Sequence, residues 1–395
     1  GKKRGGQPGH KGHHRPLLSE SEVDHLEHRF PTACGQCGNA LPPDAEGKPV
    51  RRQIWELPKV SPEVTEYQFH TVICPCCGER TAAGPDAELP AGDFGPRAEA
   101  TIAYLGAAFR LSVRERQRIL QELWGLRVST GAIKRIDDRV SAHAEPVHAQ
   151  AVEALRDAAF AHSDETSWRI EGKTGWLWTG VTDLLRVFRV DRHRSREAFE
   201  RLFGAEFGGT LISDRLSSYD RQSEDRRQLC WAHLKRDFQG FADLPEAAAR
   251  EFGRAGLVVV DSLFREWRHF RDKHGDRGRL RRRLNPTREK LAELLVAGVE
   301  GEHDKVAGFC NHLIQRAGAL WTFVDVEGVE PTNNPAERAL RHAVLWRKGS
   351  FGSQSDSGCR FVERMLTIVS TLRVQKRAII DFIAELCTAP LHGVD

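Results

Sequence analysis

Residues 158–168, AAFAHSDETSW, and residues 208–214, GGTLISD, decide the fold of this chain. Between them lie TGWLWTGVTD (174–183), LRVFRVDRH (185–193) and SREAFERLFGAEF (195–207). Alternation with period two in the first segment, in TGWLWTGVTD and in LRVFRVDRH predicts three strands joined by short turns. SREAFERLFGAEF has the pattern of an amphipathic helix, and GGTLISD predicts a fourth strand.

Three strands in series, a helix and a further apolar strand form the opening order of a ribonuclease-H-like α/β domain. We therefore predict such a core, with acidic residues on the strands at 163–166 and 211–214. Residues 238–325 and the sequence after Asn334 have helical patterns, so helices should follow the sheet along the chain.

The composition is that of a globular protein. Hydrophobic residues make up 40% and charged residues 29%, and no run approaches the roughly 18 apolar residues of a membrane span. There is no secretory leader pattern, and the cysteines do not form a spread disulfide framework, so we expect a reducing, cytoplasmic setting. The chain starts at Gly1 and its one methionine is Met365, so we expect the natural start to lie upstream.

Two Cys-x-x-Cys pairs, in CGQCG and CPCCG, have the spacing of a zinc site. Their members are Cys34, Cys37, Cys74 and Cys77. The glycine after each pair permits the tight turn that points backbone N–H groups at sulfur. The interval of 36 residues is longer than in a typical zinc ribbon, and Cys76 or His70 could replace a neighbour. We predict one structural zinc ion, with a disulfide or buried thiols as the alternative.

Positive charge is concentrated in two places. Residues 1–15, GKKRGGQPGHKGHHR, hold five Lys or Arg and no acid, and their Gly and Pro residues prevent a periodic pattern. We predict a flexible arm that contacts DNA phosphates, against the alternative of a solvated charge run. The candidate DNA-binding residues of the arm are Lys2, Lys3, Arg4, Lys11 and Arg15. For the inner run, Arg277–Arg283, both interpretations stay open.

A chain of 395 residues is too long for one ordinary core, so we expect several domains. The predicted fold class is α/β, with an all-α insertion in the core, preceded by a small zinc-binding β-domain and a helical segment. That segment is a helix-turn-helix or a plain connector. The expected boundaries are a basic arm over 1–29, the zinc-binding domain over 30–80, a linker over 81–97, the helical segment over 98–156, the first part of the core over 157–237, the insertion over 238–325 and the rest of the core over 326–395.

Three carboxylates are candidates for a metal-dependent site. Asp164 closes one predicted strand and Asp214 closes another, while Glu337, in PTNNPAERALRH, comes 123 residues later near a helix start. Converging oxygen ligands suit hard divalent cations, and three carboxylates suffice for two Mg²⁺ or Mn²⁺ ions about 3.5–4 Å apart. Such a site needs no Ser or Cys nucleophile, and it can hydrolyse DNA and then join it.

Each carboxylate also has an ordinary structural interpretation. Aspartates at strand ends are common in turns, and Asn334, Pro335 and Glu337 fit the N-cap, N1 and N3 positions of a helix start. The sequence alone leaves this helix-capping alternative open.

Other side chains on the Glu337 helix have predictable faces. Arg341 and Lys348 return to roughly the face of Glu337, where DNA would lie, so both are candidate DNA-binding residues. Trp346 falls on the opposite face and is predicted to be in the core. In CWAHLKRDF, Cys230 and His233 provide only two of the four ligands that a tetrahedral zinc site needs, so we do not predict a zinc site there.

Five motifs, in this order, resemble those of the insertion sequence 66 transposase family. They are GGQPGHKGH, DETSWRIEGKTGWLW, SDRLSSYD, CWAHLKRDF, and PTNNPAERALR followed after five residues by RKGSFGS. The resemblance covers nearly the whole chain. It implies a zinc-binding domain, a ribonuclease-H-like core with a helical insertion before Glu337, and catalysis by Asp164, Asp214 and Glu337. The similar motif in related transposases also implies a structural or DNA-contacting role beside the active site for Cys230 and His233. Members of the family resemble longer chains with a coiled-coil segment ahead of the basic arm.

The expected function is that of a DNA transposase of the Asp-Asp-Glu type, which binds the ends of a mobile element and catalyses strand cleavage and strand transfer. The expected partners are element ends, target DNA, further copies of the chain in a synaptic complex, and accessory proteins of the same element. Two alternatives are a truncated, non-catalytic DNA-binding regulator and a ribonuclease-H-like nuclease that does not join strands. The presence of all three carboxylates favours the transposase.

Overall fold

The computed structural model describes residues 15–43, 47–85, 89–90, 92–272 and 275–388. The chain divides into two compact units, Gly1–Val60 and Ser61–Asp395. Each unit is treated by itself below. No helix of the described residues is long and apolar enough to cross a membrane.

The described part of the first unit is mostly irregular. A short 3-10 turn, Glu20–Glu22, is capped by Ser19, whose backbone N–H donates to the Glu22 carboxylate at 2.9 Å. The Gln53 side chain bonds both backbone groups of Leu18, with Nε2 donating to the carbonyl and Oε1 accepting from the N–H, each at 2.9 Å. These bonds join the backbone near Leu18 to the segment around Gln53, neither of which is part of a β-sheet.

The prediction of a β-rich segment over 30–80 is only partly met. Among the described residues there, regular strands are limited to a three-residue hairpin, β1 (Thr71–Ile73) and β2 (Arg80–Ala82). In the sequence, Tyr67, Phe69 and Thr71 alternate with the polar residues Glu66, Gln68 and His70, a pattern that predicts a strand, but the strand starts only at Thr71. Tyr67 and Phe69 are exposed, so their alternation does not mark a buried face, and β2 offers only three residues to pair with.

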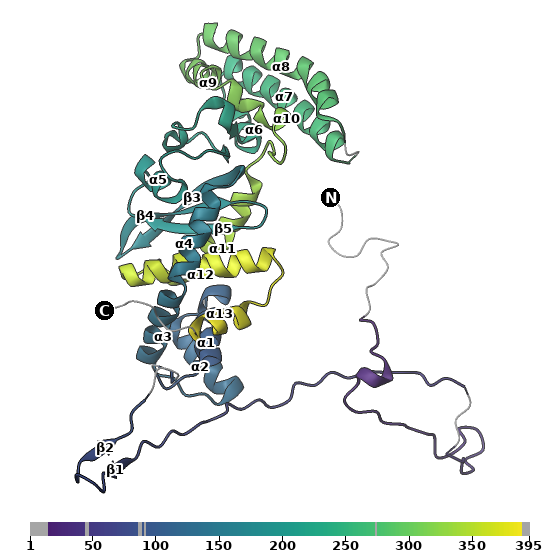
Figure 1. The fold of residues 1–395 in the computed structure, drawn as a ribbon. Helices are drawn as coiled ribbons and strands as arrows, with labels where there is room; N and C mark the ends of the chain where they lie inside the picture. Colours follow the sequence, from purple (N-terminus) through teal and green to yellow (C-terminus); the bar gives the residue numbers. More distant parts are fainter. Residues whose placement is uncertain (1–14, 44–46, 86–88, 91, 273–274, 389–395) are drawn as a thin grey trace. The chain divides into compact units, whose positions relative to one another are not determined.

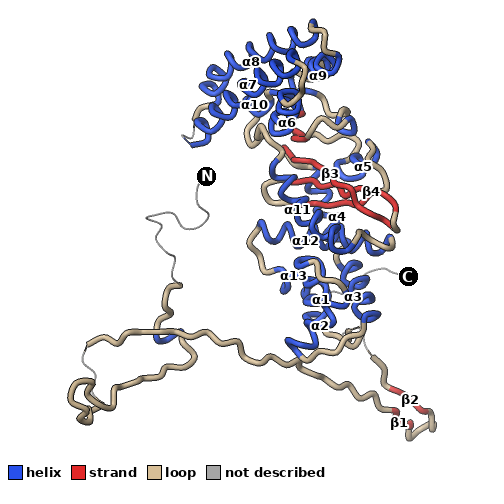
Figure 2. The backbone as a smooth tube through the Cα atoms, turned by 180° about the vertical axis from the view of Figure 1, so that it is seen from behind, coloured by secondary structure: helices blue, strands red, loops and turns tan. Residues whose placement is uncertain are grey.

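The second unit is built around one mixed five-stranded sheet (Figure 2). The order is β5-β4-β3-β6-β7; β4 is antiparallel to β3 and β5, whereas β6 is parallel to β3 and β7. The bounds are β3 (Phe160–Ile170), β4 (Lys173–Val181), β5 (Arg186–Asp191), β6 (Thr210–Ser213) and β7 (Arg227–Leu229). The predicted run of three strands, a helix and a fourth strand is confirmed, and β7 is an addition.

The β3–β4 turn shows why this hairpin forms where it does. Glu171 and Gly172 both have positive φ, 52° and 77°, and Ile170 pairs directly with Lys173. Two central residues with positive φ define a tight turn whose twist matches that of the flanking strands, and glycine adopts this conformation without a Cβ clash. The turn therefore fixes the register of the long β3–β4 ladder.

Helices make up most of the rest of the second unit. They are α1 (Pro96–Phe109), α2 (Val113–Trp124), α3 (Thr130–His143), α4 (Glu145–Arg156), α5 (Arg196–Phe203), α6 (Trp231–Ala242), α7 (Ala247–Asp272), α8 (Arg277–Glu300), α9 (Asp304–Ile314), α10 (Thr322–Asp325), α11 (Asn334–Ser350), α12 (Asp356–Val374) and α13 (Ile379–Thr388). The helical patterns after residue 98, in 238–325 and after Asn334 are thus confirmed as helices.

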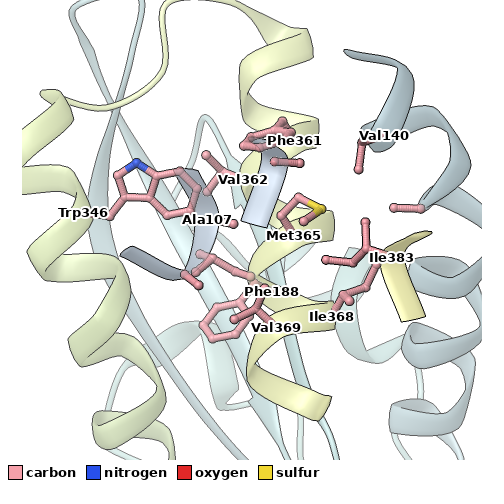
Figure 3. Packing of buried hydrophobic residues seen from close by; sticks show 14 of the residues in the cluster. Ala107, Val140, Phe188, Trp346, Phe361, Val362, Met365, Ile368, Val369 and Ile383 are labelled. Carbon is pink, nitrogen blue, oxygen red and sulfur yellow. The ribbon is translucent and has the colours of Figure 1, made fainter. Parts of the chain in front are cut away.

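Both faces of the sheet are covered by helices (Figure 1). On one face, α11 and α12 pack on β3, β4 and β5, and the same core continues into α1, α3 and α13. Figure 3 shows this core, with Phe188 of β5 and Met365 of α12 at its centre. On the other face, α4 and α5 pack over Trp178 of β4. The helical segment before the sheet therefore shares one hydrophobic core with the C-terminal helices.

Helices α6 to α10 form a separate hydrophobic cluster beyond β7, whose buried residues include Phe238, Leu263 and Leu313. The chain enters this group at Trp231 and leaves it near Pro331. The backbone N–H of Trp231 donates to the carbonyl of Pro331 at 2.9 Å. The two ends of the inserted helices therefore meet beside the sheet.

The bend between α11 and α12 fits against the end of β3. Gly352 has φ of 95°, and a Cβ there would lie 2.2 Å from the Arg169 carbonyl oxygen, so only glycine fits without displacing the backbone. Ser353 then extends beside β3: its N–H donates to the Arg169 carbonyl at 2.8 Å, and its carbonyl accepts from Glu171 N–H at 2.8 Å. This contact fixes the C-terminal end of α11.

Candidate functional site

The two candidate aspartates come from neighbouring parallel strands: Asp164 lies within β3, and Asp214 directly follows β6. The register pairs Phe160 of β3 with Thr210 of β6, so Asp164 and Asp214, each four residues further on, reach the same level. The prediction that Asp164 closes its strand was wrong, because β3 continues to Ile170. The reason is that β4 pairs with β3 along its whole length, whereas β6 stops at Ser213. Asp164 therefore lies where its parallel neighbour ends.

Glu337 reaches the same region from the first turn of α11. A cavity of about 320 Å³ lies between β3, α6 and α11, and it has both acidic and basic walls. Its lining residues are Asp164, Glu165, Thr166, His233, Arg236, Glu337, Leu340, Arg341 and Val344. Asp214 is not part of this lining, but its charge acts on Asp164. Side chains more than 170 residues apart in sequence thus share one cavity.

The carboxylates concentrate negative charge. Burial, with added repulsion from Glu165, Asp214 and Glu337, raises the pKa of Asp164 to about 8. When the pKa of a carboxyl group is this far above its ordinary value, its ionised form lacks a compensating cation. A divalent ion would supply that compensation, so the donor set fits a hard metal. Among the described residues, no group of three or more His, Cys, Asp or Glu side chains is already arranged as a metal site.

The start of α11 differs from the one that the sequence suggested. The N-cap is Asn333, so Asn334 is the first helical residue and Glu337 is the fourth, one position beyond N3. The Asn333 side chain makes no capping hydrogen bond. A capping box needs Glu at N3 to reach the N-cap N–H. The capping interpretation of Glu337 thus loses its geometric basis.

Two residues of α6 contact Glu337. Arg236 Nη2 donates to Glu337 Oε1 at 3.0 Å, and His233 Nδ1 lies 3.7 Å from the same oxygen. His233 Nδ1 is buried and has no hydrogen-bond partner among the residues that the structure describes. Burial lowers the pKa of His233, and Arg236 adds to the effect. His233 thus lies beside Glu337, and so does Arg236, which the sequence did not single out.

Glu165 is a second residue that the sequence did not single out. Its buried carboxylate accepts from Arg194 Nε at 2.9 Å and from the Tyr219 hydroxyl at 2.5 Å. Burial raises the pKa of Glu165. Glu165 lines the same cavity as Asp164, but because side chains alternate along a strand, the two adjacent acids have different hydrogen-bond partners.

The basic candidates on α11 separate in the structure. Arg341 lines the cavity, and no ion pair involves it among the described residues. Lys348 is exposed near the end of α11 and is not in the cavity lining. Trp346 is only 8% exposed and packs edge-on against Phe361, so its predicted place in the core is confirmed.

The two basic segments differ in how much of their charge is paired within the described structure. Lys2, Lys3, Arg4 and Lys11 lie outside the described residues, whereas Arg15 stacks on the Trp55 ring at 4.6 Å from its centroid. In the inner run, partners within the protein hold three arginines. Arg277 donates to the Phe323 carbonyl, Arg281 pairs with Asp325, and Arg283 pairs with Glu266. Much of the charge of this run is therefore engaged within the insertion.

Each cysteine pair forms the same local turn. In the first unit, Gly38 N–H donates to the Cys34 carbonyl at 2.9 Å, and Gly38 has φ of 73°. In the second, Gly78 N–H donates to the Cys74 carbonyl at 2.9 Å, and Gly78 has φ of 75°. Backbone hydrogen bonds from the second cysteine of each pair lower the pKa of Cys34 and of Cys74. The predicted glycine turns are confirmed at both pairs.

Fold and site together define a mixed α/β protein in which acidic side chains from β3 and from the distant helix α11 line one cavity, with the charge of Asp214 acting on Asp164. The chain matches the family described as "Transposase IS66 family" over residues 91–360, and it belongs to this family. It is 24% identical to Uncharacterized protein y4qI of Sinorhizobium fredii over 61% of the chain, and it spans about half (50%) of that relative. It is also 24% identical to Uncharacterized protein y4hP of the same organism, over 95% of the chain and 74% of that relative.

Proposed function

We propose that this chain is a DNA transposase with a ribonuclease-H-like core, which cleaves and joins DNA at the ends of a mobile element with two divalent metal ions. Membership of the family supports the transposase function. The observation that carries the catalytic part is the cavity that Asp164 and Glu337 share, where burial, with added repulsion from Glu165, Asp214 and Glu337, raises the pKa of Asp164 to about 8. The sheet order, with three antiparallel strands followed by two parallel ones, supports the ribonuclease-H-like core.

Asp164, Asp214 and Glu337 would hold two Mg²⁺ or Mn²⁺ ions, which activate water or a 3′-hydroxyl and stabilise the leaving oxygen of an in-line displacement. The protein side chains bind and orient the DNA. Arg341, in the cavity wall beside Leu340, offers a guanidinium that suits phosphate oxygens. His233 presents a buried ring nitrogen that has no hydrogen-bond partner in the described part of the chain and would gain one when DNA enters.

The function is tested by incubating the protein with labelled element-end DNA and Mg²⁺, then resolving the products. Cleavage at the element end together with joining to a second DNA molecule is the expected result. Cleavage without joining would favour a nuclease instead. DNA binding without either reaction, under conditions where Mn²⁺ is also supplied, would favour a non-catalytic regulator.

We propose further that Cys34, Cys37, Cys74 and Cys77 bind one zinc ion. The repeated glycine turn and the lowered pKa of the first cysteine in each pair support this, since zinc binds the thiolate. Purified protein is expected to contain about one zinc per chain, and Cys74→Ser should lower that content while Cys310→Ser, at a buried thiol of the insertion, should not. Protein that is folded and zinc-free as isolated would contradict the proposal.

The basic arm is proposed to add DNA affinity that depends on salt but not on sequence. Replacing Lys2, Lys3, Arg4 and Lys11 with Gln should reduce the slope of log affinity against log salt by up to about 4, because each phosphate contact contributes about 0.9. Arg281→Gln is the matched control, since Arg281 is already paired with Asp325. An unchanged slope in the arm variant would exclude the arm from DNA binding.

A further inference from the structure

We propose that Asn333 and Cys230 form a joint that sets the relative positions of the three carboxylates, and that Asn333 is a positioning residue for metal-dependent cleavage. The inference rests on the proposed function above. Neither residue lines the cavity, and both are buried, Asn333 completely. Their hydrogen bonds, taken together, reach the backbone beside each candidate metal ligand: the carbonyls of Ser163 and Ser213, which precede the two aspartates, and the N–H of Glu337.

The first link runs to β3. Asn333 Nδ2 donates to the Ser163 carbonyl at 2.7 Å, and Ser163 directly precedes Asp164. On the other side of the amide, His162 Nδ1 donates to Asn333 Oδ1 at 3.2 Å. The two contacts require a donor on one side of the amide and an acceptor on the other, so only one orientation of the side chain satisfies both.

The second link runs to β6 through Cys230. The backbone N–H of Asn333 donates to Cys230 Sγ at 3.1 Å. The backbone N–H of Cys230 donates in turn to the Ser213 carbonyl at 2.9 Å, and Ser213 directly precedes Asp214. The residue before each aspartate therefore accepts a hydrogen bond from the joint through its carbonyl. Cys230, the first residue of the Cys-x-x-His motif, connects Asn333 to β6.

The third link is the start of α11. The Glu337 N–H donates to the Asn333 carbonyl at 3.3 Å, in the first turn of the helix. Asparagine at an N-cap ordinarily accepts a bond from the N2 or N3 backbone, but the Asn333 side chain makes no such bond. The side-chain amide instead bonds to His162 and Ser163 of β3. A role in helix capping therefore does not explain this residue.

Small displacements at the joint should affect metal binding more than the fold. The C-terminal end of α11 is held independently, by Ser353 on β3, so loss of Asn333 does not release the helix. Ligand sets must keep their geometry within about 0.5 Å, and loss of groups that orient metal ligands typically costs about 10- to 100-fold in metal affinity or activity. Asn333 should therefore act through metal occupancy and rate.

The test compares Asn333→Ala with Asn334→Ala, a matched change one residue along whose side chain makes no hydrogen bond among those of the described residues. Mn²⁺ binding is measured by electron paramagnetic resonance of the free ion, and single-turnover cleavage is measured across Mn²⁺ concentrations. Asn333→Ala is expected to raise both half-saturating Mn²⁺ concentrations by about 10- to 100-fold, whereas Asn334→Ala should keep the parent values.

A second pair of variants tests the joint from its other side. Cys230→Ser keeps an acceptor for the Asn333 N–H and should restore most of the Mn²⁺ affinity that Cys230→Ala loses. A role in packing alone predicts the reverse, because a hydroxyl is the less favourable group in a buried site. Folded Asn333→Ala protein with parent Mn²⁺ affinity and cleavage, or a Ser variant no better than Ala, would overturn the proposal.

The remaining outcomes distinguish a failure of this inference from a failure of the proposed function. If neither Asn333→Ala nor Cys230→Ala yields folded protein, the joint serves the fold and the proposal is overturned. Parent protein that neither cleaves DNA nor binds Mn²⁺ in an Asp164-dependent way contradicts the proposed function itself. Parent protein that does both, while the joint variants match it, contradicts only the present inference.

Discussion

Glu337→Gln is expected to lower the rate of DNA cleavage by about 10³-fold, or about 4 kcal/mol of transition-state stabilisation, with DNA affinity nearly unchanged. The amide keeps the size of the side chain but removes the charge that a divalent ion needs. Stability should change by less than about 1 kcal/mol, because the ion pair with Arg236 is partly exposed. Single-turnover cleavage of element-end DNA and thermal melting measure the two effects.

The matched control is Glu115→Gln, in the first turn of α2. Glu115 belongs to a true capping box, in which Ser112 N–H donates to its carboxylate at 2.7 Å. This variant should cleave DNA at the parent rate and melt close to the parent. Glu337→Gln protein that retains cleavage near the parent level would rule out the three-carboxylate mechanism.

Asp164→Asn should abolish cleavage and at the same time stabilise the metal-free protein. The folded pKa of Asp164 is about 8, above its ordinary value of 3.8, so the folded state holds a proton that the unfolded state releases between these values. In the absence of metal, the contribution of Asp164 to the free energy of unfolding therefore falls as pH rises from 3.8 to about 8. Asparagine has no charge to desolvate, and it should raise the melting temperature at pH 8 by about 2–4 °C per kcal/mol of relieved repulsion.

Two comparisons isolate this effect. The advantage of the Asn variant should shrink as pH falls from 8 towards 3.8 and disappear below 3.8, where the parent carboxyl is protonated in both states. Mg²⁺ should stabilise the parent more than the variant. Asp157→Asn, at the exposed C-cap of α4, should show neither behaviour. Identical melting profiles for parent and Asp164→Asn across this pH range, with and without Mg²⁺, would disprove the crowding of Asp164.

The order of elements in the sheet could be predicted from sequence because local patterns specify it. Alternating apolar residues specify β3, β4 and β5, and the amphipathic segment specifies α5. The position of Asp164 within its strand could not be predicted, since the alternation of side chains along β3 does not reveal where its neighbour β6 ends. β7, with only three residues, is too short for a periodic signal.

The candidate site could be predicted in part for a similar reason. Acidic residues at predicted strand ends, and a glutamate near a helix start, suggested Asp214 and Glu337 from local sequence. Asn333 and Arg236 act through contacts with residues about a hundred or more positions away, and no local pattern records such pairs. The repeated Asn in PTNNPAE was visible, but capping explained it equally well before the N-cap was located at Asn333.

The closure of the inserted helices by the Trp231 N–H and the Pro331 carbonyl has an evolutionary consequence. Because the chain enters and leaves the inserted helices at adjacent points, α6 to α10 are joined to the sheet through two neighbouring backbone segments. Changes in the length or number of the helices distal to α6 need not alter the spacing between β7 and α11. Related chains are free to exchange this group of helices for a larger, smaller or differently charged one, and thereby to acquire new DNA or protein contacts without rebuilding the sheet.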